Sequence, residues 1–543
     1  MVRGWLVRVA ACACTCAAAA CSSHDHPAFI DDGPPARPVD RIPVRSAAFH
    51  PRDCWVPPPA SYAVDCGTVT TVGHADGSGG DVELAVAVVY SNGVGVAKEP
   101  VMFLDGGPGE GSIQAMLGEG IPFTSVLQDH DLVLFDQRGT GLSTPKPVCD
   151  VSETVVDTGG AADAGTIDAG ARDPTLAAVE KCHASAVASA DLSIFRSVEN
   201  ASDAEAVRRA LGYSSFDVYG VSYGTRYALT VLRDHPSAVN AAIIDSVVPL
   251  QTDLVGEQGA NVYRAIHLVG QACSDQPSCA ARYGDVEAKE LDALEKMTAT
   301  PPDVALPDGS SATVSAKLVA NLLITFMYSS ETISLLPELV QELTDEDYTA
   351  LRPLVSATPS ATPLIDTATY LSVTCAEEVP FSSPDALTRA LSPVPERWRR
   401  WVAPNALFDV CQAWDVPPSP PSENAAVSSD VPTLVTSGQY DPVTPPSYGA
   451  LAAKTLSRSK SVVFSGEAHA SSMSPCGKEA LHAFLNAPSG SIVQSCQAAS
   501  TLSFQSVGAA TPPFAIPFDT SGRRPTEKLV RFALRRFPFP LFR

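Results

Sequence analysis

A single serine between two glycines is the most constrained point of the sequence. The stretch FDVYGVSYGTRYALT, residues 216–230, changes from a short apolar run to a helical pattern at Ser222. Gly220 and Gly224 give the spacing G-x-S-x-G, which lets a strand reverse sharply into a helix because residues without side chains permit close backbone approach. The spacing predicts a strained corner that exposes the Ser222 hydroxyl, followed by a helix that ends before Pro236.

Short β-branched and apolar runs recur on both sides of this corner, with helical patterns between several of them. Such alternation predicts an α/β fold with a doubly wound, mostly parallel sheet, in which these runs are buried parallel strands. In one connecting segment, SDAEAVRRALG, Ser202 and Glu205 are a predicted capping box, and Gly212 is the predicted end of the helix. The runs are VELAVAVVY, PVMFLDG, DLVLFD, SSFDVYG, AAIIDSVV, PTLVTSG and SVVFSG.

The pattern divides the chain into six segments. A long stretch breaks the α/β rhythm with helical candidates such as EAKELDALEKM and SLLPELVQEL, and its run LVANLLITFM is too short for a membrane span and predicts a buried core. The basic, aromatic C-terminal end either packs on the body or docks on anionic lipid. We expect a signal peptide at 1–20, a Pro-rich tether at 21–60, a core at 61–246 and 431–500, a helical cap domain at 247–430, and a C-terminal extension at 501–543.

Charge and length limit the function classes. The 543 residues are 45% hydrophobic and 18% charged, enough to bury a large core. The formal net charge of −23 disfavours nucleic acid as a partner, because a polyanion is repelled. The sequence contains neither an HExxH motif nor a pair of CxxC motifs, which are typical of metal sites. We therefore expect no metal and no cofactor.

The N-terminus has the outline of an export signal. Arg3 and Arg8 precede a weakly apolar stretch that ends in AAAAC, and cleavage after Ala20 suits both ordinary signal peptidase and a bacterial lipobox that would place a lipid on Cys21. Three cysteines leave with the signal, and ten remain once Cys21 is set aside for lipid. Ten can pair completely, which favours a lipid-anchored protein outside the reducing cytoplasm.

Neighbouring cysteines along the chain provide candidate disulfide pairs. Their connectivity is a prediction from sequence separation alone. The pairs are Cys54 with Cys66, Cys149 with Cys182, Cys273 with Cys279, Cys375 with Cys411, and Cys476 with Cys496.

An exposed serine needs a base, and the base needs an orienting acid. In this fold class the catalytic residues follow the order serine, acid, histidine along the chain. The candidates for the base in the C-terminal third are His469 and His482. His482 lies within a helical pattern and is expected at the surface or in packing, whereas His469 follows a strand in SGEAHASS. Asp441 in SGQYDPVTPP is the preferred acid, with Asp245 as the rival position.

The oxyanion of an acyl-transfer reaction requires preorganised backbone N–H donors. The residue after the nucleophile, Tyr223, is one candidate. The glycine-rich loop FLDGGPGEG, residues 103–111, directly follows a strand and supplies the other, for which Gly107 is preferred and Gly106 comes next.

Taken in order, DGGPG, DQRGTGLS at residues 136–143, YGVSYGT, YDPVTPP and GEAH resemble the proline-iminopeptidase-related serine exopeptidases of the α/β-hydrolase fold, particularly their tripeptidyl-aminopeptidase-like branch. The resemblance covers about residues 80–500. It implies hydrolysis of an amide bond near the free N-terminus of a peptide, under a helical cap that blocks longer extensions.

Several residues take expected roles from this resemblance or depart from it. The first loop of that family often begins HGGPG, whereas this chain has Asp105 in place of the histidine and Glu110 after the turn. This departure leaves backbone donation possible. Asp136 and Arg138 are expected to support the shape of their loop.

Similar enzymes bind the substrate's ammonium with acidic residues in the cap. In LSVTCAEEV, Glu377 and Glu378 follow Cys375, whose predicted bridge to Cys411 would fix their position. Adjacent residues on a helix point about 100° apart, so one of the two is expected to face the cleft, and Glu377 is preferred.

The sequence therefore predicts an exported serine aminopeptidase that acts on peptide substrates through Ser222, His469 and Asp441. An esterase or lipase with the same three residues is the first alternative. The second is a non-catalytic envelope binding protein that shares the fold, because a fold does not dictate a function.

Overall fold

The computed structural model describes residues 48–93, 98–149, 174–306, 309–352, 355, 365–403, 407–490, 502 and 504. Everything stated below about structure concerns these residues. The predicted signal peptide, the lipidation of Cys21 and nearly all of the C-terminal extension lie outside the described residues.

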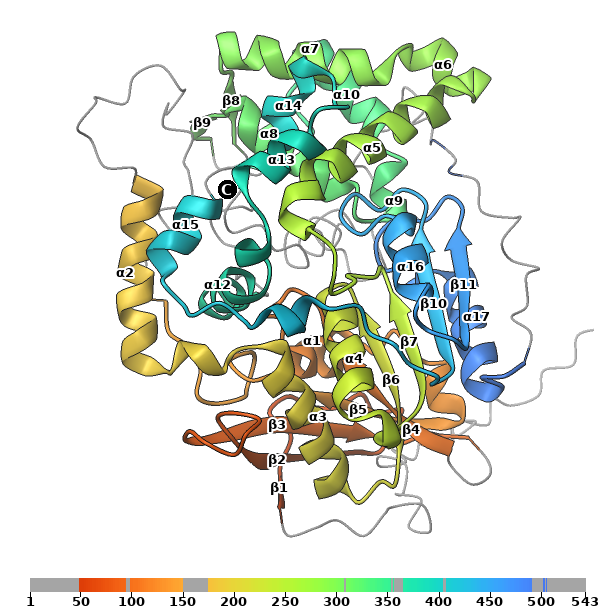
Figure 1. Cartoon of the computed structure of the whole chain (residues 1–543). Coiled ribbons are helices and arrows are strands. Elements are labelled where there is room, and N and C mark those ends of the chain that lie inside the picture. Colours follow the sequence, from red (N-terminus) through yellow and green to blue (C-terminus); the bar gives the residue numbers. More distant parts are fainter. Residues whose placement is uncertain are drawn as a thin grey trace, which may run out of the picture.

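A nine-stranded sheet forms the centre of the molecule (Figure 1). Its strands lie in the order β1-β2-β3-β5-β4-β6-β7-β10-β11. The bounds are β1 Phe49–Arg52, β2 Val64–Val72, β3 Asp81–Val89, β4 Lys98–Leu104, β5 His130–Phe135, β6 Phe216–Val221, β7 Val239–Asp245, β10 Thr433–Gly438 and β11 Ser459–Phe464.

All seven apolar runs of the sequence form strands of this sheet, and the predicted fold class is confirmed. The neighbours from β5 to β11 pair in parallel. The prediction that all seven are parallel is wrong for β3, which pairs antiparallel with both β2 and β5. The short connection between β2 and β3 explains the first of these two pairings, because a short hairpin can join only antiparallel strands.

The predicted tether at 21–60 also needs a correction. Residues 49–52 form β1, which pairs with β2 along its whole length. Phe49 is buried, and a side chain at Gly67 of β2 would collide with its ring. Burial of one aromatic ring and ladder hydrogen bonds therefore order a segment whose proline content predicted no regular element.

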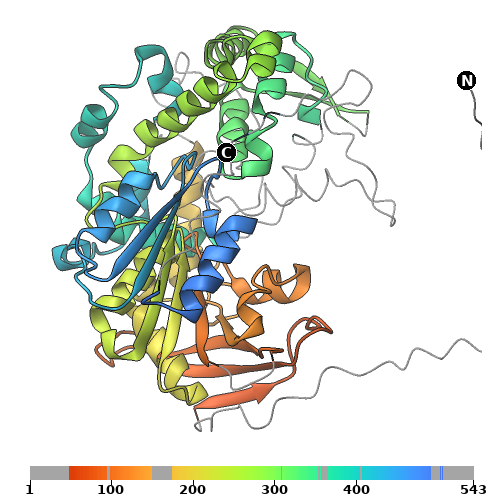
Figure 2. The ribbon, with the colours of Figure 1, turned by 90° about the vertical axis from the view of Figure 1, so that its right-hand side faces the viewer.

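Helices cover both faces of the sheet, and each face has its own hydrophobic core. Figure 2 shows α1 and α17 on one side of the strands and α4 and α16 on the other. Buried residues of α3 and α4 pack against one face, and those of α1 and α17 against the other. These helices are α1 Ser112–Glu119, α2 Pro174–Ser189, α3 Ser197–Leu211, α4 Tyr223–Asp234, α16 Pro446–Ala453 and α17 Pro475–Asn486.

The start of α3 differs from its prediction. The helix begins at Ser197, so Ser202 lies inside it, and Glu205 pairs with Arg208 and Arg209 instead of a helix end. The predicted capping box is therefore wrong. The predicted end is confirmed, because Gly212 follows the helix with φ 78°.

A helical segment lies above the carboxyl ends of the parallel strands (Figures 1 and 2). We call its first part, residues 254–355, together with α13 and α14, the cap; these helices share a third hydrophobic core. None of the described helices is long and apolar enough to span a membrane. The elements are α5 Leu254–Ser274, α6 Pro277–Tyr283, α7 Val286–Ala299, β8 Asp303–Ala305, β9 Ser311–Thr313, α8 Ala316–Phe326, α9 Ser330–Ile333, α10 Leu336–Thr344, α12 Thr367–Glu377, α13 Pro384–Ala390, α14 Glu396–Val402 and α15 Leu407–Trp414.

Candidate active site

Ser222 lies at the corner between β6 and α4, where the sequence pattern placed it. Its backbone has φ 58° and ψ −125°, a conformation that costs free energy for a residue with a side chain. The Ser222 N–H donates to the carbonyl of Asp245 at 3.0 Å, and the Ser222 carbonyl accepts from the N–H of Thr225 at 2.9 Å. The neighbouring strand and the first turn of α4 therefore hold the strained serine in place.

Both glycines of the corner are needed because main chains meet there. A Cβ atom at Gly220 would collide with the carbonyl of Gly224, and one at Gly224 would collide with the carbonyl of Leu104 in β4. The spacing G-x-S-x-G is thus explained by backbone contact. The Ser222 side chain faces a cavity of about 940 Å³.

His469 and Asp441 lie together at the carboxyl edge of the sheet, after β11 and β10. His469 Nδ1 and Asp441 Oδ2 are 2.8 Å apart, and both side chains are buried. The other oxygen, Asp441 Oδ1, accepts the N–H groups of Val443 and Thr444 at 2.9 and 2.8 Å. The acid thus has a fixed orientation, and the histidine has one ring nitrogen left for another partner.

Burial and mutual charge set the pKa values of this pair. Burial opposes ionisation of the Asp441 carboxyl, but the charge of His469 and hydrogen bonds from His469 and Thr444 outweigh it and lower its pKa. Burial also opposes protonation of His469, but the charge and hydrogen bond of Asp441 raise the pKa of the imidazole above its ordinary value. The pair therefore favours a charged imidazolium, as a general base requires after it has accepted a proton.

The two rival residues have other partners. Asp245 is buried and accepts hydrogen bonds from Thr436, Ser471 and Ser472. His482 lies on α17 and pairs with Asp129 at 3.3 Å. Asp441, not Asp245, is the acid hydrogen-bonded to His469.

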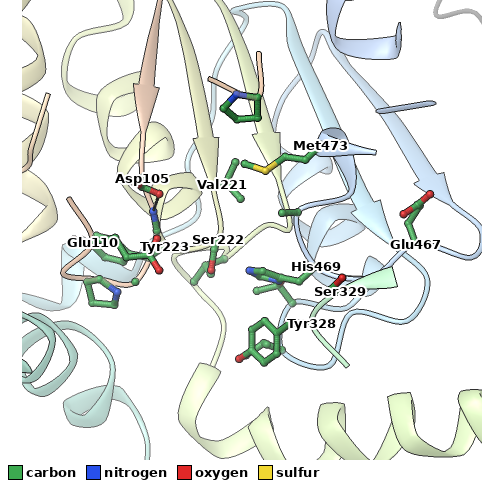
Figure 3. Close-up of a pocket in the computed structure, with 18 of the residues that line it drawn as sticks. Asp105, Glu110, Val221, Ser222, Tyr223, Tyr328, Ser329, Glu467, His469 and Met473 are labelled. Carbon is green, nitrogen blue, oxygen red and sulfur yellow. Dashed lines mark hydrogen bonds between the residues drawn. The ribbon is translucent and has the colours of Figure 1, made fainter. Parts of the chain in front are cut away.

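Ser222 and His469 line the same cavity, and Figure 3 shows the imidazole directed toward the serine. Among the described residues, no hydrogen bond joins the Ser222 hydroxyl to His469. Such bonds are often long without substrate and shorten when substrate binds. The structure thus brings the serine and the histidine–aspartate pair that the sequence selected to one cavity.

The glycine-rich loop after β4 lies beside the serine. A Cβ atom at Gly106 would be 3.3 Å from the Cβ of Ser222, and Gly107 also lines the cavity. Asp105 accepts hydrogen bonds from the Gly106 N–H and from the Ser112 hydroxyl, at 2.9 and 3.0 Å. The aspartate that replaces the family's histidine therefore shapes this loop, while Glu110 lines the cavity.

The two charged residues of the DQRGTGLS loop, Asp136 and Arg138, are buried, do not line the cavity and do not pair with each other. Asp136 accepts the N–H groups of Ile113 and Leu142, and burial raises its pKa to about 6. Arg138 donates two hydrogen bonds to Asp203, at 2.7 and 2.8 Å. Both residues bind the loop to neighbouring elements.

The two cap-side glutamates have different surroundings, and the preference for Glu377 as the residue facing the cleft needs correction. Glu377 accepts hydrogen bonds from the Ser197 hydroxyl at 2.7 Å and from Arg226 Nε at 3.1 Å, and it does not line the cavity. Glu378 lines the cavity, and its carboxylate lies 3.2 Å from Arg226 Nη1. Glu377 is the last residue of α12, and its contacts with Arg226 and Ser197 direct its carboxylate into the protein interior.

Arg226 was not selected from the sequence. It lies on α4, one turn beyond Ser222, and is 1% exposed. A signal was present, since a charged residue within the otherwise buried stretch YGTRYALT needs a buried partner. Burial and the charge of Glu377 raise the pKa of Glu378 to about 7, although the arginine opposes this shift.

Four of the five predicted disulfides are confirmed, and the fifth stays a prediction because Cys496 lies outside the described residues. The confirmed bridges are Cys54–Cys66, Cys149–Cys182, Cys273–Cys279 and Cys375–Cys411. They are consistent with an oxidising compartment. The described residues contain no cluster of three or more His, Cys, Asp or Glu side chains that could hold a metal ion.

Two family models match the chain. One, described as alpha/beta hydrolase fold, matches residues 99–289, and the other, described as TAP-like protein, matches residues 400–492. The first covers the serine corner and the second covers Asp441 and His469. Together with the sheet order, they define the chain as a hydrolase with the α/β-hydrolase fold.

Two relatives are about a quarter identical to this chain over the residues that align with it. Serine protease Hip1 of Mycobacterium tuberculosis (strain ATCC 25618 / H37Rv) is 25% identical over 439 residues, which is 74% of this chain and 81% of that protein. Tripeptidyl aminopeptidase of Streptomyces lividans is 26% identical over 247 residues, 44% of this chain and 46% of that one. The solved proline iminopeptidase of Mycobacterium smegmatis has 14% identity and a TM-score of 0.36 over 78% of this chain and 98% of that one.

These findings confirm the resemblance that the motifs indicated. The chain is related to the tripeptidyl-aminopeptidase-like hydrolases, and relatives named as a serine protease and a tripeptidyl aminopeptidase support a serine hydrolase.

Proposed function

We propose that the protein is an exported serine peptidase that cleaves peptides near a free N-terminus. In the proposed reaction, His469 removes the proton from Ser222 as the hydroxyl attacks the scissile carbonyl. Asp441 holds the imidazole in the tautomer whose other nitrogen can accept that proton, and it stabilises the charged ring. The amine then leaves with a proton from His469, and water releases the acyl group from Ser222.

The oxyanion of this reaction needs two donors. The N–H of Tyr223 begins α4, so the helix dipole adds to its attraction for negative charge. The N–H of Gly107 is the proposed second donor. The contact of its neighbour, Gly106, with Ser222 supports a loop close enough to serve.

The observation that carries the peptidase proposal is the charge around Arg226. Two buried carboxylates, Glu377 and Glu378, share this one permanent cation. With both ionised, the cluster has a net charge of −1, and Glu378 is the member that lines the cavity. A substrate ammonium would complete the pairing, whereas a neutral acyl ester would leave the charge unbalanced.

We further propose that the mature protein begins at a lipidated Cys21 and works outside the cytoplasm. The support is the AAAAC sequence, the even number of remaining cysteines and the four disulfides. Electrospray mass analysis of the membrane fraction tests this. A diacylglyceryl adduct on the N-terminal peptide is expected, and an unmodified N-terminus would contradict it.

A two-step assay tests the enzymatic proposal. A fluorophosphonate probe should label the wild-type protein, and Ser222→Ala should abolish labelling and lower kcat by about 10⁴-fold or more. A panel of fluorogenic tripeptidyl amides, free or N-acetylated, then tests the substrate class. Preference for free amines supports the proposal, equal turnover of simple esters indicates an esterase, and absence of labelling indicates a non-catalytic protein.

A further inference from the structure

The cap contacts the acid–base pair as well as covering the cavity. Two of the loop residues that flank the pair, Tyr440 before Asp441 and Ala468 before His469, are buried in the hydrophobic core of the cap rather than in either core of the sheet. The backbone joins these two loops, because the Tyr440 N–H donates to the carbonyl of Glu467 at 2.9 Å. The loops therefore pack as part of the cap.

Polar contacts from the cap hold the histidine loop. The Ser330 hydroxyl, at the start of α9, donates to Glu467 Oε2 at 2.6 Å and accepts the N–H of Ala468 at 3.0 Å. These two residues immediately precede His469. One cap side chain thus uses both its donor and its acceptor on the loop that carries the base.

Two other cap residues contact the pair from the same side. The ring of Tyr328 meets the His469 imidazole edge-on, with centroids 5.2 Å apart (Figure 3). Arg264 of α5 donates to the carbonyl of Gln439 at 3.0 Å and to the carbonyl of Asp441. Contacts from three places in the cap therefore limit the movement of both loops.

We propose that the cap positions the acid–base pair for the reaction, and that Ser330 is the residue that holds the histidine loop. This inference rests on the proposed function of the pair and extends it. The end of β7 and the first turn of α4 hold Ser222, whereas the residues that precede His469 are held by a segment more than 130 residues before them in the chain. Ser330 lines the cavity, but its hydroxyl bonds to the loop that precedes His469, so we assign it a positioning role.

The test compares Ser330→Ala with a matched cap variant, Ser274→Ala, in the full mature chain. Ser274 lies at the end of α5 and does not line the cavity, and its hydroxyl donates to the carbonyl of Gly270 at 3.0 Å, so its removal deletes a cap hydroxyl without touching the histidine loop. Ser330→Thr is the rescue variant, since it keeps the hydroxyl. Thermal unfolding of each variant reports whether the fold persists.

Two readouts follow the position of His469. In the Ser330→Ala variant, kcat on a free-amine tripeptidyl amide should fall about tenfold while KM changes less than about twofold, because the two hydrogen bonds that are lost act on the chemical step through the histidine loop. NMR of protein labelled with ¹³C-histidine should show a lower pKa for His469, because a looser loop weakens the contact with Asp441 that raises it. Ser274→Ala should leave both the kcat and the pKa of His469 unchanged, and Ser330→Thr should restore them.

An unchanged titration of His469 together with an unchanged kcat in Ser330→Ala would overturn the inference, even if the variant unfolds at a lower temperature. The NMR titration needs no turnover. If the wild-type protein neither hydrolyses a substrate nor reacts with the fluorophosphonate, the proposed function fails, and the titration still decides whether Ser330 positions the histidine.

Discussion

Two groups of oppositely charged buried residues reach the cavity that Ser222 lines, and they differ in the number of carboxylates and in the kind of cation. In the pair Asp441–His469, one carboxylate meets one cation that can lose its proton. In the cluster of Arg226, Glu377 and Glu378, two carboxylates meet one cation that stays charged at any physiological pH. In the first group the cation can give up its proton, whereas in the second group the cation is permanent and only the carboxyl of Glu378 has a pKa raised to about 7.

This difference indicates separate roles beside one nucleophile. The pair is balanced when the imidazole is protonated, so it stabilises the charge that the reaction creates. The cluster has a net charge of −1 when both carboxyls are ionised, and our proposal is that it then favours a ligand that supplies a positive charge. Variants that change one group without the other should therefore separate the rate of chemistry from the choice of substrate.

The largest effect is expected for Asp441→Asn. The asparagine oxygen can still accept the N–H groups of Val443 and Thr444, so its amide nitrogen would face His469 and donate to Nδ1. That contact selects the tautomer with a proton on the nitrogen that faces Ser222, which can no longer act as a base. We expect kcat to fall about 10⁴-fold in steady-state assays, with the fold retained.

Asp245→Asn is the matched control for this variant. Asp245 is equally buried at the same edge of the sheet, but its oxygens serve Thr436, Ser471 and Ser472. We expect a lower melting temperature and a fall in kcat of less than about tenfold, because only neighbours of the active site shift. Equal losses of kcat in the two variants would contradict the assignment of the acid.

The positions of the site residues in the structure also show where sequence reasoning succeeds. Ser222, Asp441 and His469 could be chosen from sequence because each follows a strand at the edge where parallel strands end, and because chain order excludes most rivals. Gly220 and Gly224 mark a backbone contact that only glycine permits. Local pattern and chain order are enough for such features.

The remaining features depend on contacts between distant segments. Nothing near Glu377 indicates that Arg226, about 150 residues earlier, would turn it away from the cavity. In the same way, burial of Phe49 against β2 orders a proline-rich segment, and α3 begins five residues before its predicted cap. Side-chain direction and element ends are decided by packing, which a single sequence pattern does not contain.

The second prediction concerns the charge cluster and substrate choice. Glu378→Gln removes the uncompensated charge that lines the cavity, so kcat/KM for a free-amine tripeptidyl amide should fall about 10- to 100-fold. This fall corresponds to the free energy of one hydrogen bond between charged groups. Turnover of a small acyl ester without an amine should change little. Parallel assays of the two substrates give the ratio directly.

Glu377→Gln serves as the control from the same helix end. It should weaken hydrogen bonds to Ser197 and Arg226 and lower the free energy of unfolding by about 1–3 kcal/mol, while the ratio of amide to ester turnover stays near that of the wild type. If Glu377→Gln abolishes the selectivity for a free amine and Glu378→Gln keeps it, then Glu377, the residue preferred from the sequence, is the one that binds the amine.

The smallest expected effect is a difference in pH dependence between the two substrates. His469 must be neutral to accept a proton, and its pKa is raised, so turnover of either substrate falls as the pH drops through that pKa. A free-amine peptide also needs Glu378 to be ionised, and burial raises the pKa of that carboxyl to about 7. Below pH 6, log kcat/KM should therefore change with a slope of about two for the peptide and about one for the ester.

The variant Glu378→Gln should reduce the slope for the peptide to about one, because only the imidazole then titrates. Equal slopes for both substrates in the wild-type protein would show that no carboxylate of the cluster contributes to recognition of the amine, and the two charged groups beside Ser222 would then lose their proposed division of roles.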